Sequence, residues 1–127
     1  MITNVEEENF NPPLTSPVQT SSGKITGFVD EANEVQVYLG IPYAEPPTGA
    51  LRYKPTKELV TPYVERVCTE HAPAAPQTAM PFDTLMCVEI EYQSEDCLYL
   101  NVWVPVITAN NKKLPVIVWF HPGACMR

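Results

Sequence analysis

A short turn near the end of the sequence carries the residues best suited to chemistry. It runs from His121 to Ala124 in the order His-Pro-Gly-Ala and follows the apolar stretch Leu114–Phe120. A continuous run of β-branched and aromatic residues is typical of a strand covered on both faces. Open α/β sheets bind ligands beyond the carboxyl ends of such strands. The turn is therefore a candidate binding site, although Pro122 and Gly123 also suit a plain turn.

Thiols and imidazoles elsewhere give weaker signals. No CxxC pair occurs among the four cysteines and only two histidines accompany them, so no zinc site is expected. A nucleophilic role for Cys125, beside the turn, lacks a base to activate it. His71, in a region without periodicity, is interpreted as a solvated loop residue. The spacing allows one disulfide but no disulfide framework among Cys68, Cys87, Cys97 and Cys125.

The composition of the 127 residues predicts one small folded domain. About 45% of the residues are hydrophobic, which is enough for a core. The 14 prolines, against 5 glycines, argue against a helical bundle because proline breaks helix interiors. A net charge of −7 repels phosphate backbones, so no nucleic-acid partner is expected.

The sequence contains no targeting or membrane signal. Met1–Phe10 includes three successive glutamates where a secretory leader needs a basic end and an apolar run. The longest apolar stretch, Leu114–Phe120, is too short to cross a bilayer. We therefore expect a cytoplasmic chain with no membrane segment, and only a start upstream of Met1 would reopen secretion.

The elements that must position the turn begin after a polar lead. Residues 1–16 lack periodicity and are interrupted by prolines, which predicts a loose lead before a domain over 17–127. Val18–Thr20 and Lys24–Val29 favour β structure, and the Ser-Ser-Gly turn between them predicts a hairpin.

Alternation and proline content divide the rest of the chain. Val35–Leu39 and Leu98–Val104 alternate apolar and other residues, as half-buried strands do. Gly40–Pro55 holds four prolines and predicts an irregular loop. Leu59–Glu91 shows no convincing period, apart from one short predicted strand near Val64–Val67.

Three stretches in order resemble type-B carboxylesterases and cholinesterases. Gly40–Tyr53 begins Gly-Ile-Pro-Tyr-Ala-Glu-Pro-Pro, Ser94–Val102 contains Ser-Glu-Asp-Cys-Leu-Tyr-Leu-Asn-Val, and Leu114–His121 is similar to the strand that leads to the oxyanion loop. The likeness extends over roughly Val18–Cys125. It implies an α/β class, the N-terminal portion of an α/β-hydrolase fold, with mostly β-strands and long loops in this chain.

The resemblance assigns catalytic roles within the turn. Esterases of this class stabilise the oxyanion of the tetrahedral intermediate with backbone N–H groups of a His-Gly-Gly-Gly-type loop. The matching donors are Gly123 and Ala124, and the methyl group of Ala124 narrows the space for bulky groups. Pro122 replaces a glycine, which removes one N–H and fixes φ near about −65°. His121 matches a scaffold residue of the loop, and not the catalytic base.

Structural roles follow from the same resemblance. Arg52 is expected to pair with Glu95, which ties the proline-rich loop to the turn before the next strand. Cys97 matches a disulfide cysteine, but Ala75 occupies the usual position of its partner. The disulfide is therefore missing or rewired, with Cys87 as the alternative partner. Free thiols at all four cysteines are the favoured interpretation, consistent with a reducing compartment.

The implied activity is incomplete in this chain. It contains no Gly-x-Ser-x-Gly, and the downstream acid and histidine of the triad are absent. The resemblance implies a fragment of a carboxylic ester hydrolase with a Ser-His-acid triad, a small-molecule ester as substrate, and no metal or cofactor. Without the nucleophile, the chain alone is expected to be inactive.

Alternative functions remain open at this point. Pro122 favours a non-catalytic relative that serves in adhesion or binding, and a degenerate gene product is a further alternative. Ala75–Cys97 lacks the tryptophan that binds a quaternary ammonium in cholinesterases, so choline specificity is not supported. An unpartnered Leu114–Phe120 strand predicts low solubility of the isolated chain.

Overall fold

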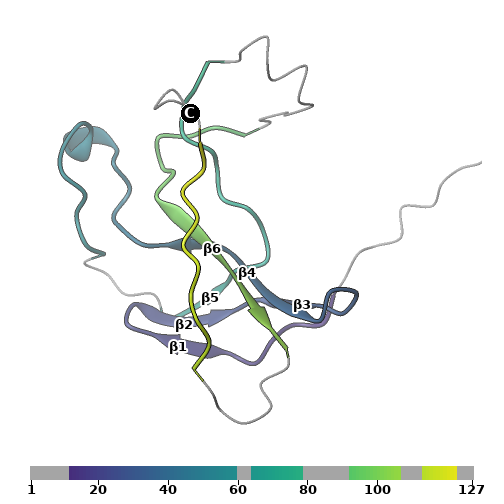
Figure 1. Cartoon of the computed structure of the whole chain (residues 1–127). Coiled ribbons are helices and arrows are strands. Elements are labelled where there is room, and N and C mark those ends of the chain that lie inside the picture. The colour runs from purple at the N-terminus through teal and green to yellow at the C-terminus, as the bar shows by residue number, and fades with distance from the viewer. Residues whose placement is uncertain (1–11, 60–63, 79–91, 107–112, 123–127) are drawn as a thin grey trace, which may run out of the picture.

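The protein is built mainly from short strands in two sheets. The computed structural model describes residues 12–59, 64–78, 92–106 and 113–122. Within these residues, six strands form two three-stranded sheets, ordered β1-β2-β5 and β3-β4-β6 (Figure 1). A single turn of 3-10 helix, η1 (Gly49–Leu51), lies in the proline-rich loop. No helix in this part of the chain is long and apolar enough to cross a membrane.

The first sheet combines a local hairpin with a distant strand. β1 (Val18–Thr20) and β2 (Gly23–Thr26) pair antiparallel, and β5 (Glu65–Val67) joins β2 in parallel. The hydroxyl of Thr20 closes the hairpin turn by donating to the Gly23 carbonyl oxygen at 2.7 Å. The predicted hairpin and the short strand near Val64–Val67 are both confirmed.

The second sheet is antiparallel throughout. β3 (Phe28–Asp30) pairs with β4 (Val35–Pro42), which pairs in turn with β6 (Tyr99–Pro105). β4 therefore extends three residues beyond the predicted strand. The register shifts between Tyr38 and Ile41, where Gly40 takes a positive φ of 67°. A bulge of this kind bends the strand locally, and glycine accepts the conformation without steric cost.

The chain passes from the first sheet to the second at Gly27, which divides the predicted Lys24–Val29 strand into β2 and β3. A Cβ atom at this position would lie 2.1 Å from the carbonyl oxygen of Val37. Only glycine allows backbones to approach so closely. A glycine inside a strand pattern is thus the signal that marks the crossover.

A small core lies between the sheets. Ile25, Tyr38, Ile41 and Cys68 form one buried cluster, and the half-buried Val104 packs against it. Every residue from Val37 to Ile41 is buried, so β4 is covered on both faces instead of being half-buried as predicted. The segment after β5 accounts for part of this cover, because the Leu39 N–H donates to the Cys68 carbonyl oxygen at 2.8 Å.

The ordered part of the chain begins before residue 17. Thr15 is buried and exchanges two hydrogen bonds with Gly27, each of 3.0 Å. The Val29 N–H donates to the Pro13 carbonyl oxygen at 2.8 Å. Two residues of the lead predicted over 1–16, Pro13 and Thr15, are thus joined by hydrogen bonds to the start of the sheets. Residues 1–11 lie outside the described part.

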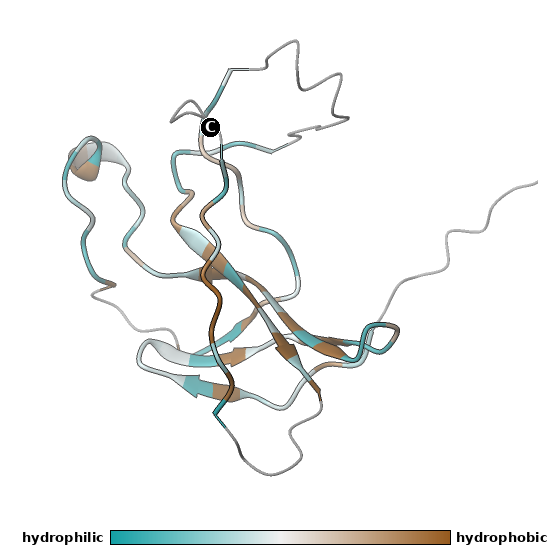
Figure 2. Ribbon diagram, viewed as in Figure 1, coloured by the Kyte–Doolittle hydropathy of each residue, from teal (hydrophilic) through white to brown (hydrophobic). Residues whose placement is uncertain are grey.

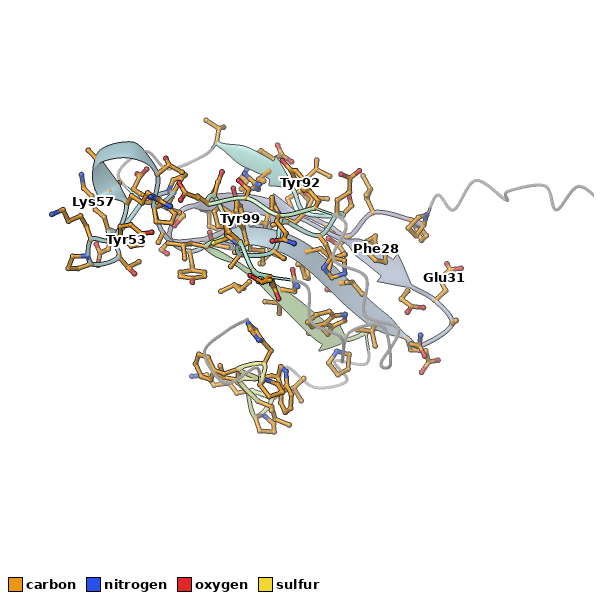
Figure 3. The ribbon with its side chains drawn as sticks, turned by 90° about the horizontal axis from the view of Figure 1, so that it is seen from above. Phe28, Glu31, Tyr53, Lys57, Tyr92 and Tyr99 are labelled. Atoms are coloured by element: carbon orange, nitrogen blue, oxygen red, sulfur yellow. The ribbon has the colours of Figure 1, made fainter. Side chains whose placement is uncertain are left out.

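The strand predicted for Leu114–Phe120 does not form within the described residues. The segment 113–122 crosses in front of the sheets in Figure 1, but the turned view of Figure 3 separates it from the layer of strands. Figure 2 shows it as one of the most apolar stretches, and its side chains are exposed. A strand requires a hydrogen-bonding neighbour, and no described residue supplies one here. Apolar composition alone could not reveal this.

Candidate functional site

The predicted catalytic turn lies at the edge of the described residues. His121 and Pro122 are exposed at the end of the apolar segment, and the His121 Nδ1 lies 3.1 Å from the Pro122 carbonyl oxygen. Gly123 and Ala124 lie outside the described residues, as do Cys87 and Cys125. The oxyanion role of Gly123 and Ala124 therefore stays a prediction.

Arg52 and Glu95 meet in an ion pair, from the Nε atom to the Oε1 atom. Arg52 follows η1, whereas Glu95 precedes β6, so the contact joins two irregular segments. The Arg52 guanidinium also lies over the ring of Tyr53, 4.6 Å from its centroid. The hydrogen bond that Arg52 donates to Glu95, together with the negative charge of Glu95, raises the pKa of Arg52. Both side chains are largely exposed, so the pair fixes geometry more than it adds stability.

The turn that carries Glu95 is ordered by further polar contacts. The Asp96 N–H donates to the Ser94 Oγ at 3.1 Å, and the Tyr99 hydroxyl donates to the Asp96 Oδ2 at 3.0 Å. The Ser94 N–H donates to the Ala74 carbonyl oxygen at 3.0 Å. The second family-like stretch is therefore anchored to the segment after β5.

Two thiols can be placed, and both are free. Cys68 is 1% exposed and belongs to the core. Cys97 is half-buried, beside the ion pair. Burial raises the pKa of each thiol, and the charges of Asp96 and Glu95 raise that of Cys97 further. A thiol kept neutral in this way is a poor nucleophile, so neither cysteine is a candidate catalytic group.

A pocket of about 380 Å³ lies where β4, β5 and β6 meet the segment after β5. Arg66 and Tyr99 line it together with His71 and Gly40. The Asn101 Oδ1 accepts the Gly40 N–H at 2.9 Å, while the Asn101 Nδ2 lies 3.4 Å from the His71 Nδ1. The sequence interpretation of His71 as a solvated loop residue omitted this contact, and it gave Arg66 no role. The polar Asn101 within an apolar, alternating strand was the sequence signal that could have indicated a polar site here.

The described residues hold no cluster of three or more histidine, cysteine or acidic side chains arranged to bind a metal ion. Two of the described arginines, Arg52 and Arg66, each lie over an aromatic ring. Arg52 is neutralised by Glu95. Arg66 has no carboxylate within salt-bridge distance among the described residues.

Comparisons with known proteins agree on one family. The profile described as "Carboxylesterase family" matches residues 15–127. Carboxylesterase 1D of Rattus norvegicus is 34% identical over 122 residues, which cover 89% of this chain and 21% of the relative. A probable cholinesterase of Acanthamoeba polyphaga mimivirus is 38% identical over 114 residues, covering 84% of this chain and 18% of the relative.

Solved structures give the same result. A thermophilic PNB esterase superposes with a TM-score of 0.70 at 40% identity, over 85% of this chain and 21% of the esterase. A carboxylesterase of Geobacillus stearothermophilus superposes with a TM-score of 0.68 at 35% identity, over 88% of this chain and 20% of that enzyme. This chain thus spans about a fifth of the length of the relatives it matches.

Proposed function

This chain belongs to the carboxylesterase family and has the N-terminal part of an α/β-hydrolase fold, and on that premise we propose that it supplies the oxyanion-stabilising portion of a serine hydrolase for small carboxylic esters. The observation that carries the proposal is the likeness to the PNB esterase, at a TM-score of 0.70 and 40% identity. Because the chain covers about a fifth of such relatives, the activity is assigned to a polypeptide that also holds the nucleophile.

The chemistry assigned to this chain is stabilisation of developing charge. Attack on an ester carbonyl makes its oxygen negative, and the N–H groups of Gly123 and Ala124 are the proposed donors. Each donor of this kind contributes about 3–4 kcal/mol to stabilising the transition state. The Arg52–Glu95 pair supports the proposal indirectly, because it holds together two of the three family-like stretches.

We assign the nucleophilic step to residues outside this chain. No Gly-x-Ser-x-Gly occurs in the 127 residues, and the two described thiols are free but suppressed by burial. Oxyanion donors alone have no acyl-enzyme to stabilise. The chain by itself is therefore proposed to be inactive toward esters.

A transplant tests both parts of the proposal. Residues 15–127 replace the matching part of a PNB esterase, and hydrolysis of p-nitrophenyl acetate is compared for the chimera and for the chain alone. We expect turnover by the chimera and none by the chain. Circular dichroism establishes that each protein is folded before its activity is interpreted. Ester turnover by the chain alone, or a folded chimera without activity, would contradict the proposal.

A non-catalytic binding role is the second candidate, and Pro122 is the residue that favours it. Proline at this position lacks an N–H and restricts φ, which can misdirect the neighbouring donors. In the same chimera, Pro122→Gly separates the two candidates. A change in kcat below tenfold supports the esterase, whereas a chimera that is active only with glycine supports a binding protein, because one lost donor costs roughly 10²–10³ in kcat.

A further inference from the structure

The pocket beside β5 includes no residue of the segment 113–122, which leads to the predicted oxyanion turn. Its wall includes Arg66 of β5 and Tyr99 at the start of β6. Figure 3 labels Tyr99 within the layer of strands, well apart from the segment 113–122 that leads to the turn. A volume of about 380 Å³ lies within the range of small-molecule sites, which is roughly 300–1,000 Å³.

The guanidinium of Arg66 is the cationic group among the arginine and lysine side chains that line this pocket. It lies over the ring of Tyr99, 5.6 Å from the centroid, and lowers the pKa values of both Tyr99 and Cys68 against the larger, opposing effect of burial. These two neighbours are a phenol and a thiol, and both are neutral near pH 7. The side chain is therefore positioned without being neutralised by them.

A half-buried cation of this kind normally has an anionic partner. The Arg66 Nε is buried and has no hydrogen-bond partner among the described residues. No described carboxylate lies within salt-bridge distance of it, whereas Arg52 has Glu95. Glu70 lines the same pocket without forming such a bridge. Arg66 lines the pocket, so its charge, which no described carboxylate balances, borders a space that a ligand can enter.

The other lining groups restrict the chemistry of that ligand. Leu39, Val67, Ala72 and Pro73 contribute apolar surface, and Thr69 and His71 add polar groups. A guanidinium recognises a planar carboxylate through two parallel N–H donors. We propose that this pocket binds a small carboxylate with an apolar body, held by Arg66. The proposal is independent of the oxyanion turn and does not rest on the esterase assignment.

The test is calorimetric titration of the full chain with benzoate, with benzamide as the neutral isostere and inorganic phosphate as the alternative oxyanion. We expect benzoate to bind and benzamide to bind at least tenfold more weakly. Phosphate is expected to be weaker than benzoate, because it cannot use the apolar wall. Absence of benzoate binding, or equal affinities for benzoate and benzamide, would overturn the proposal. Phosphate binding as tight as benzoate binding would overturn the carboxylate assignment.

Paired variants locate the effect. Arg66→Met removes the charge at similar length and is expected to weaken benzoate at least tenfold. Arg66→Lys keeps the charge without the fork and is expected to bind with intermediate affinity, which guards against a folding defect in the first variant. Arg52→Met is the matched control, since it removes an arginine outside the pocket, and its affinity is expected to stay within twofold of the natural chain.

The carboxylate of Glu70 is expected to oppose benzoate binding, whereas Arg66 favours it. Glu70→Gln removes the carboxylate among the lining residues and is expected to tighten benzoate binding. Loss of affinity in Arg52→Met equal to that in Arg66→Met would show a non-specific charge effect and contradict the site. Unchanged affinity in Arg66→Met, with the circular dichroism of the natural chain, would do the same.

Discussion

The thiol of Cys68 illustrates how far single side chains are set by their surroundings. It is 1% exposed and follows β5 directly, and its backbone N–H donates to the Thr26 carbonyl oxygen of β2 at 2.7 Å. Desolvation raises its pKa, while the nearby Arg66 lowers it to a smaller extent. The sequence predicted free structural thiols, which holds for Cys68 and Cys97, but spacing could not place Cys68 in the core.

This burial predicts a loss of stability at alkaline pH. In the unfolded chain the thiol ionises near its ordinary pKa of 9, whereas the folded thiol stays protonated to higher pH. Between these values the unfolded chain binds fewer protons, so the free energy of unfolding falls as pH rises. Urea denaturation at intervals from pH 7 to 10.5 measures this fall in the free energy of unfolding. We expect the decline to be shallower in Cys68→Ala than in the natural chain, and equal slopes would contradict the argument.

At the scale of elements, hydrogen-bonding partners decided what the sequence could predict. The β1–β2 hairpin has a local partner and a Ser-Ser-Gly turn, so its pattern sufficed. Leu114–Phe120 carries a stronger β pattern, but no described residue pairs with it. The Arg52–Glu95 contact was anticipated from the family resemblance alone. The Arg66 pocket was missed because it gathers residues from three separate stretches, 39–40, 66–73 and Tyr99, and Arg66 itself belongs to no motif.

The close approach of the backbone at Gly27 to β4 predicts that a side chain at this position destabilises the fold. A Cβ here meets the Val37 carbonyl oxygen at 2.1 Å, so Gly27→Ala must displace β3 from β4. We expect a loss of about 1–3 kcal/mol or more in the free energy of unfolding, measured by urea denaturation. Gly49→Asn is the control. A Cβ atom at position 49 would meet no atom within 4 Å, and asparagine tolerates the φ of 53° found there. A loss of the same size in both variants would contradict the crossover argument.

At the scale of the whole molecule, the described residues form a small core and leave much apolar surface exposed. Four residues form the buried cluster, whereas the large side chains of 116–120 are mostly exposed. Apolar surface of this extent favours association. The comparisons offer a reason, since relatives are about five times longer than the part this chain matches. Family and fold were therefore predictable from motifs. The exposure of the segment 113–122 was not, because it results from the lack of a strand neighbour among the described residues.

If chains associate through the exposed apolar residues 116–120, one charge placed among these residues should improve solubility. We expect Ile117→Lys to raise the monomer fraction in sedimentation velocity, because the segment's apolar run is interrupted. Val64→Lys is the matched control, since Val64 is also 91% exposed but stands outside the segment, and both variants change net charge equally. Equal improvement by the two variants would attribute the effect to charge alone.

The pairing of β4 with β6 also sets an order of events during synthesis. The contact between Gly40 and Asn101 spans 61 residues, whereas β4 can pair with β3 as soon as both have left the ribosome. At about 5–20 residues per second, β6 follows β4 by several seconds. During that interval one edge of the most apolar strand in the core has no partner. During synthesis the open edge of β4 is thus exposed to pairing with other chains until β6 arrives.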